Sequence, residues 1–590
     1  MATSSSPAGY NRFLLLVAGL GGLLYGVDVG IIAGALPYLE ATSGFSASQL
    51  SFIVAAVLLG TVISTLFAGL IADWIGRKWL MTLCGLLFVV SIPVIALSHS
   101  YEMLIAGRLL QGISGGFIGV VIPLYLAECL GAASRGKGTG VFQWMLTLGI
   151  VAAALVGMAF SAHVDAVTKT GTPEQIFAFK DAAWRGIFWV SLPPGILFVL
   201  GSFLVAESPR WLYKRGQRDA ARAALLRSRT PEQAEIELAE MDATSGHEKK
   251  QAAAGVVRES LLRRKYVIPF GLACLILACN QATGVNSVIG YNPTILYQAG
   301  LSDVQAHSGY VILTLINFLT TIGAVMLVDR KGRKFLLSLG TAGIILSLVC
   351  AGLIFQKNET QRVDCVDAVQ ALVTSNQTVS VAFDDATATR LLGASGSNAA
   401  MNGHAKSLII TYSYGGFIAA SKVVRSDDAS AKPIAISRSD AVPGTKVAAF
   451  FSHPFTSLDA AATAPLKIEH ALISPVPTEQ NGWLVAICID AFMAFFAIGP
   501  GVCVWLALSE LMPTRIRSNG MSIALLINQV VSTTIAAVFL PTVGRYGYST
   551  MFFIWAGCTV VYFLTAVFLL PETKGKTLEE IEEHFEGKKS

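Results

Sequence analysis

The stretch GLIADWIGRK at residues 69–78 has a second copy in the chain, LVDRKGRK at 327–334. Each copy follows a long apolar run and ends in basic residues, so we expect both to lie at the same end of two membrane helices. A second motif repeats in the same order: YLAECLGAASRG holds Glu128 and Arg135, and LSELMPTRIRSNG holds Glu510 and Arg517. Because both copies run in the same direction, they predict two halves related by a parallel repeat.

The spacing of the two repeated motifs also reveals an insertion. The separation from Glu128 to Glu510 exceeds that from Asp73 to Asp329 by about 126 residues. We place these extra residues in the polar stretch 356–481, where the runs 378–383, 407–414 and 446–451 are typical of short strands. Three interpretations of this insertion stay open: an accessory fold, a disordered loop, or a module that binds a solute or a glycan.

The composition of the 590-residue chain predicts a membrane protein, because 53% of its residues are hydrophobic and only 14% are charged. Nine cysteines are scattered singly and eight histidines show no ligand spacing, so we expect no metal site and no disulfide framework. We find no nucleophile beside a base and no phosphate-binding loop. The sequence therefore predicts a protein that is not an enzyme, has no cofactor and binds no nucleic acid.

Twelve apolar runs are long enough to cross the roughly 30 Å hydrocarbon core of a bilayer. Because the number is even, both termini lie on one side, and the loops on that side carry the Lys and Arg residues that mark the cytoplasm. We expect a monomeric, multi-pass protein of the plasma (cell inner) membrane with both termini in the cytoplasm. The runs are 12–36, 50–72, 79–98, 104–127, 139–161, 184–206, 266–298, 308–328, 335–355, 483–509, 519–542 and 549–570. The expected domains are 1–206, a linker at 207–265, 266–355, the insertion at 356–481, 482–570 and a tail at 571–590.

Nine motifs in a fixed order resemble the sugar porter family of the major facilitator superfamily, which contains proton-coupled galactose, arabinose and xylose symporters and animal glucose facilitators. The resemblance implies an all-α membrane protein with the major facilitator fold, twelve helices in two six-helix halves and a cytoplasmic helical bundle. The insertion then lies outside the cell, between helices 9 and 10. The motifs are GGLLYGVDVGIIAGAL (21–36), GLIADWIGRK, GRLLQGISGG, PLYLAECLGAASRG, AESPRWL (206–212), NQATGVNSVIGYNP (280–293), DRKGRK, GPGVCVWLALSEL (499–511) and PETKG (571–575).

The resemblance also implies a substrate site made of polar residues deep in the helices. Side-chain amides both donate and accept hydrogen bonds, so they can hold the hydroxyls of a sugar without burying a charge. The flat face of a tryptophan can cover the C–H side of the ring. The expected substrate-binding residues are Gln143, Asn280, Gln281, Asn286, Asn317, Trp505 and Asn528. The chain departs from the family pattern at Asn280, Gly290, Val502, Gln529 and Trp74, and the loss of two aromatic residues implies a more open or more polar pocket.

Charged residues at the predicted cytoplasmic helix ends suit a gate. Opposite charges there can hold the halves together when this side is shut and must separate when it opens. The simpler interpretation is that these residues only determine topology. The expected gating residues are Asp73, Arg77, Glu128, Arg135, Asp329, Arg333, Glu510 and Arg517. The resemblance implies that Glu207, Arg210 and Glu572 are further parts of this gate.

One carboxylate, Asp28, stands inside the first apolar run, where an unpaired charge costs several kcal/mol. At 1.5 Å per residue, Asp28 and Arg108 both lie in the outer half of the membrane, so they can pair. We expect them to couple proton movement to the import of a monosaccharide or related polyol by alternating access. Two alternatives remain: a passive facilitator in which the pair is static, and a nutrient sensor that signals through the insertion.

Overall fold

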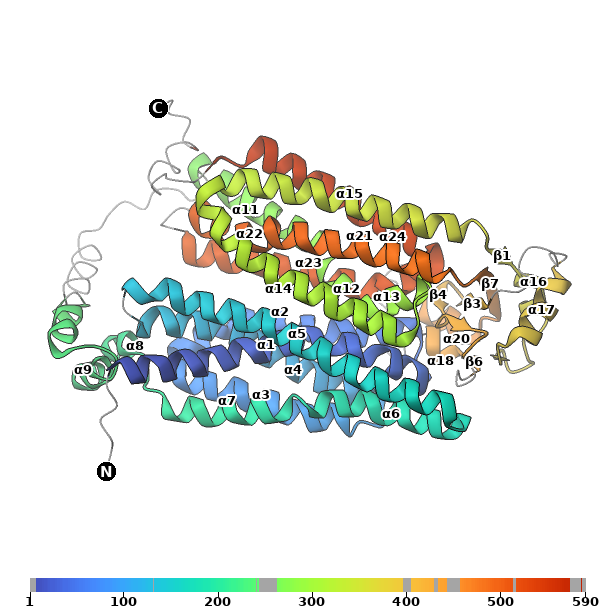
Figure 1. Cartoon of the computed structure of the whole chain (residues 1–590), viewed down its shortest axis with the longest axis horizontal. Coiled ribbons are helices and arrows are strands. Elements are labelled where there is room, and N and C mark those ends of the chain that lie inside the picture. The colour runs from blue at the N-terminus through green and yellow to red at the C-terminus, as the bar shows by residue number, and fades with distance from the viewer. Residues whose placement is uncertain are drawn as a thin grey trace.

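The computed structural model describes residues 7–130, 132–239, 241–242, 263–395, 405–428, 433–442, 457–512, 516–572 and 585, without the side chains of 132–139, 325, 329, 505–510, 517–519 and 522. Within these ranges, twelve helical segments are long and apolar enough to cross a membrane. They form two groups that lie side by side, one coloured blue to green and the other green to red in Figure 1. This arrangement confirms the two halves that the repeated motifs predict.

The first half contains six spans, the last of which is made of two helices. A short apolar cluster of the linker, which includes Leu212, Leu225 and Leu238, packs after the last span. The helices are α1 (Pro7–Ser43), α2 (Ala47–Ile75), α3 (Arg77–Ala96), α4 (Tyr101–Cys129), α5 (Ala132–Thr170), α6 (Pro173–Trp189) and α7 (Leu192–Leu204), followed by α8 (Pro209–Lys214) and α9 (Arg218–Leu226) of the linker.

The second half repeats this order, but three of its spans are interrupted. The helices before the insertion are α11 (Arg264–Ala282), α12 (Val285–Gly290), α13 (Asn292–Gln298), α14 (Asp303–Lys331) and α15 (Arg333–Glu359). Those after it are α21 (Glu479–Ile498), α22 (Pro500–Leu511), α23 (Arg517–Tyr546), α24 (Tyr548–Leu564) and the π-helical η1 (Thr565–Leu569).

The residues between α15 and α21 form a small folded unit with its own apolar core, which includes Leu408, Ile410 and Ile473. An antiparallel sheet has the order β1-β7-β3-β4, with β5 also paired to β3, and β2 pairs with β6. The strands are β1 (Val363–Asp364), β2 (Val379–Val381), β3 (Lys406–Tyr414), β4 (Phe417–Ala420), β5 (Val424–Arg425), β6 (Ile434–Ile436) and β7 (Leu466–Pro475); the helices are α16 (Val366–Gln370), α17 (Asp385–Ala394), α18 (Arg438–Ala441) and α20 (Leu458–Thr463).

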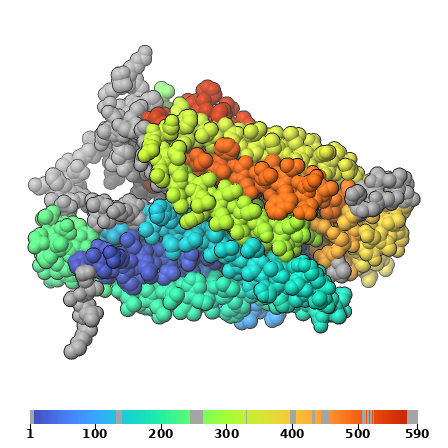
Figure 2. Space-filling model, viewed as in Figure 1, coloured from blue at the N-terminus to red at the C-terminus, as the bar shows by residue number. Residues whose placement is uncertain are grey.

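Two of the three strands expected in the insertion fall on β2 and β3, whereas 446–451 lies outside the described residues. For the described part, the disordered-loop interpretation is wrong, because β3 is buried along its whole length. Figure 2 shows this unit, in yellow and orange, seated at one end of the helical bundle. We call that end the insertion end, and the opposite end, where α1 begins and η1 finishes, the terminal end.

Several helices of the bundle touch backbone to backbone, because glycines remove the side chain at the contact. A Cβ on Gly26 of α1 would lie 1.8 Å from the carbonyl oxygen of Leu146 in α5, and one on Gly112 of α4 would lie 2.0 Å from that of Val57 in α2. Small residues allow this close approach in membrane helix pairs. The glycines therefore determine which helix faces meet.

The two halves are joined at the insertion end. Tyr310 Oη donates to Gly30 O at 3.1 Å, and the amide of Leu540 donates to Ser51 Oγ at 3.1 Å. Four further hydrogen bonds between the halves, which join Tyr38 and Ser161 to Asp303, Tyr291 to Ser51 and His307 to Gly34, also have their partners in the insertion-end part of the helices. In Figure 1 the halves converge toward this end. The bundle is therefore closed at the insertion end.

The glycine contact between α1 and α5 yields a first prediction. Replacing Gly26 with Ala forces the helices apart, so we expect a loss of about 1–3 kcal/mol in stability. Thermal unfolding of the purified protein in detergent measures the effect as a lower Tm. Gly69→Ala on α2 is the matched control, because nothing lies within 4 Å of a Cβ at that position. Equal Tm values for the two variants would contradict the packing argument.

Candidate functional site

A cavity of about 460 Å³ lies between the two halves. This volume is in the range of small-molecule sites in proteins. Helices of both halves line it: α1, α2, α4 and α5 from the first, and α11, α12, α14, α21, α22 and α23 from the second. A site between two repeated halves is where transporters of this architecture hold their cargo.

A break in the seventh span positions two of the predicted residues at this cavity. The sequence predicts one continuous span at 266–298, but the structure divides it into α11, α12 and α13. Gly284 adopts φ +83°, and a Cβ there would lie 2.3 Å from the indole ring of Trp555. Only glycine suits both conditions. Gln281 therefore lies just before the break and Asn286 just after it.

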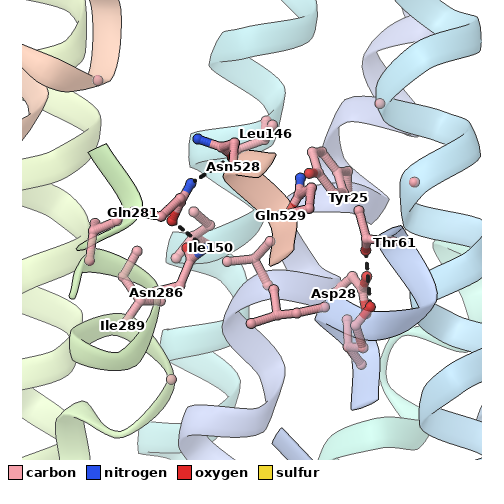
Figure 3. A pocket seen from close by; sticks show the side chains of 18 of the residues that line it. Tyr25, Asp28, Thr61, Leu146, Ile150, Gln281, Asn286, Ile289, Asn528 and Gln529 are labelled. Atoms are coloured by element: carbon pink, nitrogen blue, oxygen red, sulfur yellow. Dashed lines mark hydrogen bonds between the residues drawn. The ribbon is translucent and has the colours of Figure 1, made fainter. Parts of the chain in front are cut away.

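The amides of the second half form a hydrogen-bonded chain along one wall. Asn286 Nδ2 donates to Gln281 Oε1 at 3.0 Å, and Gln281 Nε2 donates to Asn528 Oδ1 at 3.2 Å. Asn286 also donates to Ser532 Oγ at 2.7 Å, and Asn528 donates to the carbonyl of Leu277 at 3.0 Å. Figure 3 shows the three amides together on one side of the cavity. Their mutual bonds fix which atoms face the space.

The remaining predicted polar residues are also at the cavity. Gln143 lies opposite on α5, while Asn280 and Asn317 line the wall formed by the second half. The Oδ1 atom of Asn280 is buried and has no hydrogen-bond partner among the described residues. A buried acceptor without a partner is costly unless something binds to it. Trp505 belongs to α22, but its side chain lies outside the described residues.

Three of the five departures from the family pattern line the same cavity: Asn280, Gly290 and Gln529. Gly290 and Gln529 replace the two aromatic residues, so the wall has lost flat apolar faces and gained an amide. The more open or more polar pocket that these departures imply stays a prediction.

Asp28 also faces this cavity, across from the amide chain (Figure 3). Its side chain is 1% exposed, and neither carboxyl oxygen has a hydrogen-bond partner among the described residues. A Cβ on Gly115 of α4 would lie 2.6 Å from Asp28 Oδ2, so this glycine leaves the space that the carboxyl occupies. The ring of Tyr25 packs next to it over the same glycine.

The expected ion pair between Asp28 and Arg108 is not formed in this structure. Arg108 Nη1 instead donates to Gln111 Oε1 at 2.6 Å, and the guanidinium lies over the ring of Phe188 at 5.6 Å. Arg108 precedes Gly115, which faces Asp28, by two turns of α4, about 10 Å along the helix axis. The two groups line one cavity, but a neutral glutamine holds the arginine away from the carboxyl.

Charged residues of the first half meet at the terminal end of the bundle. The guanidinium of Arg77 lies 2.9 Å from Asp73 and 2.9–3.0 Å from the two carboxylate oxygens of Glu128. Glu207 accepts hydrogen bonds from the backbone amides of Arg77 and Lys78 at 2.9 and 3.1 Å. A carboxylate at this position complements the positive N-terminus of α3.

The second half repeats this arrangement. Glu572 accepts hydrogen bonds from the amides of Arg333 and Lys334 at 3.2 Å, at the N-terminus of α15. Arg333 Nη1 donates to the carbonyl of Val328, as Arg77 Nη1 donates to that of Ala72. Each of the hydrogen bonds and ion pairs named here joins two residues of the same half.

Of the other predicted gating residues, the structure describes the side chain of Arg210 alone. Arg210 is exposed and forms no ion pair with a described residue; Arg215 approaches the end of α2 instead, donating to the carbonyls of Asp73 and Trp74. The helices that carry the remaining four are described, but their side chains are not. These residues are Arg135, Asp329, Glu510 and Arg517.

Sequence reasoning missed several polar residues at or beside the cavity. Gln111 lies three residues after Arg108 in the quoted motif GRLLQGISGG, and Ser532 lies one helical turn after Asn528. Both spacings put the residues on one helix face, so the pattern contained the signal. Tyr25 and Thr61 line the cavity itself. Their role depends on the contact between α1, α2 and α4, which no local pattern reports.

Comparison with known proteins agrees with this geometry. The model of the family described as "Sugar (and other) transporter" matches residues 14–381 and 461–585. The "Probable metabolite transport protein CsbC" of Bacillus subtilis is 26% identical over 575 residues, covering 97% of this chain and 94% of that protein. The "Galactose-proton symporter" of Escherichia coli is 33% identical over 330 residues, covering 56% of this chain and 66% of that protein.

A solved structure of the xylose transporter XylE from E. coli has the same fold. It superposes with a TM-score of 0.63 at 19% sequence identity, covering 96% of this chain and 99% of that chain. At this identity the likeness concerns the fold alone.

The network around Arg77 yields a second prediction. The Arg77 side chain is 5% exposed, so Arg77→Ala leaves Glu128 buried without its cation. We expect a loss of about 3 kcal/mol, seen as a lower Tm in detergent. Arg210→Ala removes an arginine of the same region that is exposed, and its Tm should equal that of the unchanged protein. A similar Tm for both variants would show that the Arg77 network contributes little.

Proposed function

Because the chain belongs to the sugar (and other) transporter family, the sugar porters of the major facilitator superfamily, we propose that it is a symporter that carries a monosaccharide or related polyol together with a proton. The observation that carries this proposal is one cavity with a chain of neutral amides on one wall and an unpaired buried carboxyl, Asp28, on the other. The first suits a polyhydroxylated, uncharged solute, and the second suits a proton.

The amide chain supports the choice of substrate class. A sugar or polyol presents hydroxyls that donate and accept, and the amides of Gln281, Asn286 and Asn528 offer both functions without a charge. The unpartnered Oδ1 of Asn280 adds an acceptor for one hydroxyl. Relatives include proteins named as a galactose-proton symporter and a proton myo-inositol cotransporter, which agrees with a hexose, a pentose or an inositol as cargo.

Asp28 supports the coupling to protons. A carboxylate that is almost fully buried and has no donor beside it is most stable when it carries a proton. In our proposal the proton enters from the side of higher proton activity when the cavity opens there. In the present state Arg108 is bound to Gln111. At another stage of the proposed cycle Asp28 releases its proton, and Arg108 then pairs with the ionised carboxylate.

Alternating access follows from the contacts between the halves. The present state is joined across the halves at the insertion end, whereas the ion pairs of Arg77 at the terminal end are with residues of its own half. When the terminal end shuts, the groups around Arg77 and Arg333 come together and can bond across the halves. We propose that the terminal end faces the cytoplasm, because the basic loops lie there, and that the insertion end faces outward.

The Asp28 assignment predicts the behaviour of Asp28→Asn. An amide cannot exchange a proton, so this variant should lose accumulation of sugar against its gradient but still exchange labelled for unlabelled sugar. Proteoliposomes with an imposed proton gradient measure the first, and counterflow without a gradient measures the second. A panel of labelled hexoses, pentoses and inositol identifies the cargo beforehand.

The matched control is Asp490→Asn on α21, a second carboxylate within a membrane helix that does not line the cavity. Its uphill accumulation should equal that of the unchanged protein. Undiminished accumulation in Asp28→Asn would remove the coupling role from this residue. Symport removes protons from the medium when sugar is added to energised cells that express the unchanged protein. If the pH of the medium then stays constant, the protein is a passive facilitator.

Gln281 carries a further prediction, because it is the central link of the amide chain. Gln281→Ala removes a substrate contact and also releases Asn286 and Asn528 from their partner. We expect the KM for uptake to rise by about tenfold or more, equivalent to about 1.4 kcal/mol or more. Gln233→Ala in the exposed linker is the control and should leave KM unchanged. An unaltered KM in Gln281→Ala would place the substrate elsewhere.

A further inference from the structure

A polar cluster outside the cavity joins the two halves at the insertion end. Its centre is His307 of α14, whose side chain is fully buried. The imidazole Nδ1 lies 2.9 Å from the backbone carbonyl oxygen of Asp303, and Nε2 lies 3.3 Å from that of Gly34 in α1. The apolar-run boundaries predict that His307 precedes its span, but α14 begins at Asp303 and includes it.

The hydrogen-bond partners of the His307 ring indicate its protonation state. Both nitrogens face carbonyl oxygens, which only accept hydrogen bonds, and a neutral imidazole has one N–H to donate. Its second nitrogen would then point a lone pair at an acceptor in a buried site. An imidazolium donates from both nitrogens and satisfies both carbonyls. The contacts around His307 therefore fit the protonated ring.

A negative charge stands beside the ring. Asp303 Oδ1 lies 3.4 Å from Nδ1, and Oδ2 accepts hydrogen bonds from Tyr38 Oη and Ser161 Oγ, each at 2.7 Å. Two donated hydroxyl bonds favour the ionised carboxylate. The ring of Tyr38 also stacks on the imidazole, with centroids 5.6 Å apart and planes 4° apart. The site holds a charged pair with complementary partners.

We propose that His307 is a second proton-binding site of this transporter, separate from Asp28, which is filled while the insertion end is closed and loses its high proton affinity when that end opens. The inference rests on the alternating access proposed above. In this proposal the proton on His307 stabilises the closed insertion end and takes no part in binding at the cavity.

The reason is that the two halves share the site. Gly34, Tyr38 and Ser161 belong to the first half, whereas Asp303 and His307 belong to the second. Opening the insertion end separates α1 and α5 from α14. The ring then loses the acceptor at Nε2 and the stacked tyrosine, and Asp303 loses two donors. Water replaces these partners, so the open state binds the proton less tightly.

The sign of the effect follows from linkage. A proton that binds the closed state more tightly shifts the equilibrium toward closure when protons are abundant. Acid on the insertion side therefore favours the closed insertion end. Raising the pH removes this advantage and favours opening.

The other ionisable groups near the ring do not offer a competing explanation. Tyr38 comes from α1, and Tyr297 of α13 interacts electrostatically with Asp303. Glu479 of α21 accepts a hydrogen bond from Gln305 at 2.5 Å. Ser161 of α5 is neutral. Among the described groups, Asp303 is thus the charge that acts on His307.

The test measures how the closed fraction depends on pH. The full chain, with its native cysteines replaced, carries one spin label on the loop after α1 and one on the loop before α14 and is reconstituted in nanodiscs. Electron paramagnetic resonance then measures the distance between the two labels, which reports the separation of the halves. Between pH 5 and 8.5 we expect the open-to-closed ratio to rise by up to about tenfold per pH unit, the limit for one coupled proton. His307→Gln should flatten this dependence.

The matched control is His99→Gln, an exposed histidine at the same end of the bundle, between α3 and α4. It should keep the full pH dependence. Asp28→Asn removes only the cavity proton, so the part of the pH dependence that His307 supplies should remain in this variant. A pH dependence that is lost in Asp28→Asn and kept in His307→Gln would overturn the inference, as would a closed fraction in the unchanged protein that does not vary with pH.

A second variant serves if His307→Gln does not fold. Tyr38→Phe keeps the stacked ring and removes only the hydroxyl that bonds Asp303. We expect a higher open-to-closed ratio at acid pH and a shallower pH dependence, because the carboxylate is less well held in the closed state. A ratio equal to that of the unchanged protein at every pH would also overturn the inference.

Discussion

Backbone contact between α1 and α5 at Gly26 is the constraint on which the site depends. No side chain fits between this glycine and the carbonyl of Leu146, so the two helices meet at a fixed height. Two residues along α1, Asp28 is thereby aimed at α4, where Gly115 leaves room for its carboxyl. Substituting a larger residue at either glycine would move the carboxyl away from the cavity.

The internal repeat of the sequence appears in the structure as two equivalent helix caps. Gly76 and Gly332 adopt φ +100° and +88°, and a Cβ on either would collide with the carboxylate of Glu207 or Glu572. Each carboxylate accepts the first backbone amides of the next helix, α3 or α15. Gly76 and Gly332 therefore leave room for the capping carboxylates, while the next residues, Arg77 and Arg333, supply the cations of the charge networks.

The insertion is tied to both halves at the closed end. Lys180 of α6 lies 3.5 Å from Asp428, and the guanidinium of Arg425 lies over the ring of Tyr297 in α13 at 4.4 Å. Arg425 also donates to the carbonyl of Tyr297 at 3.3 Å. Separation of the halves at this end must therefore stretch one of these attachments or carry the unit with one half.

The number of spans, their order and the two-half repeat could be predicted from the sequence, because hydrophobic length and motif order are properties of the chain itself. The amide positions were also predictable, and all of those with described side chains line the cavity. The ion pair of Asp28 with Arg108 was predicted from equal depth in the membrane. Depth along a helix does not report which neighbour reaches a side chain first.

The tertiary structure alone decided three features. Gln111 holds Arg108 away from Asp28, the seventh span breaks at Gly284 beside Trp555, and His307 lies between carbonyls of two different helices. Each results from contacts between residues far apart in the chain. The sequence by itself determined a twelve-helix sugar porter with a polar cavity and a buried carboxyl. Packing decided the partners of its charges, because a buried charge responds to the atoms within a few ångströms and not to its place in the sequence.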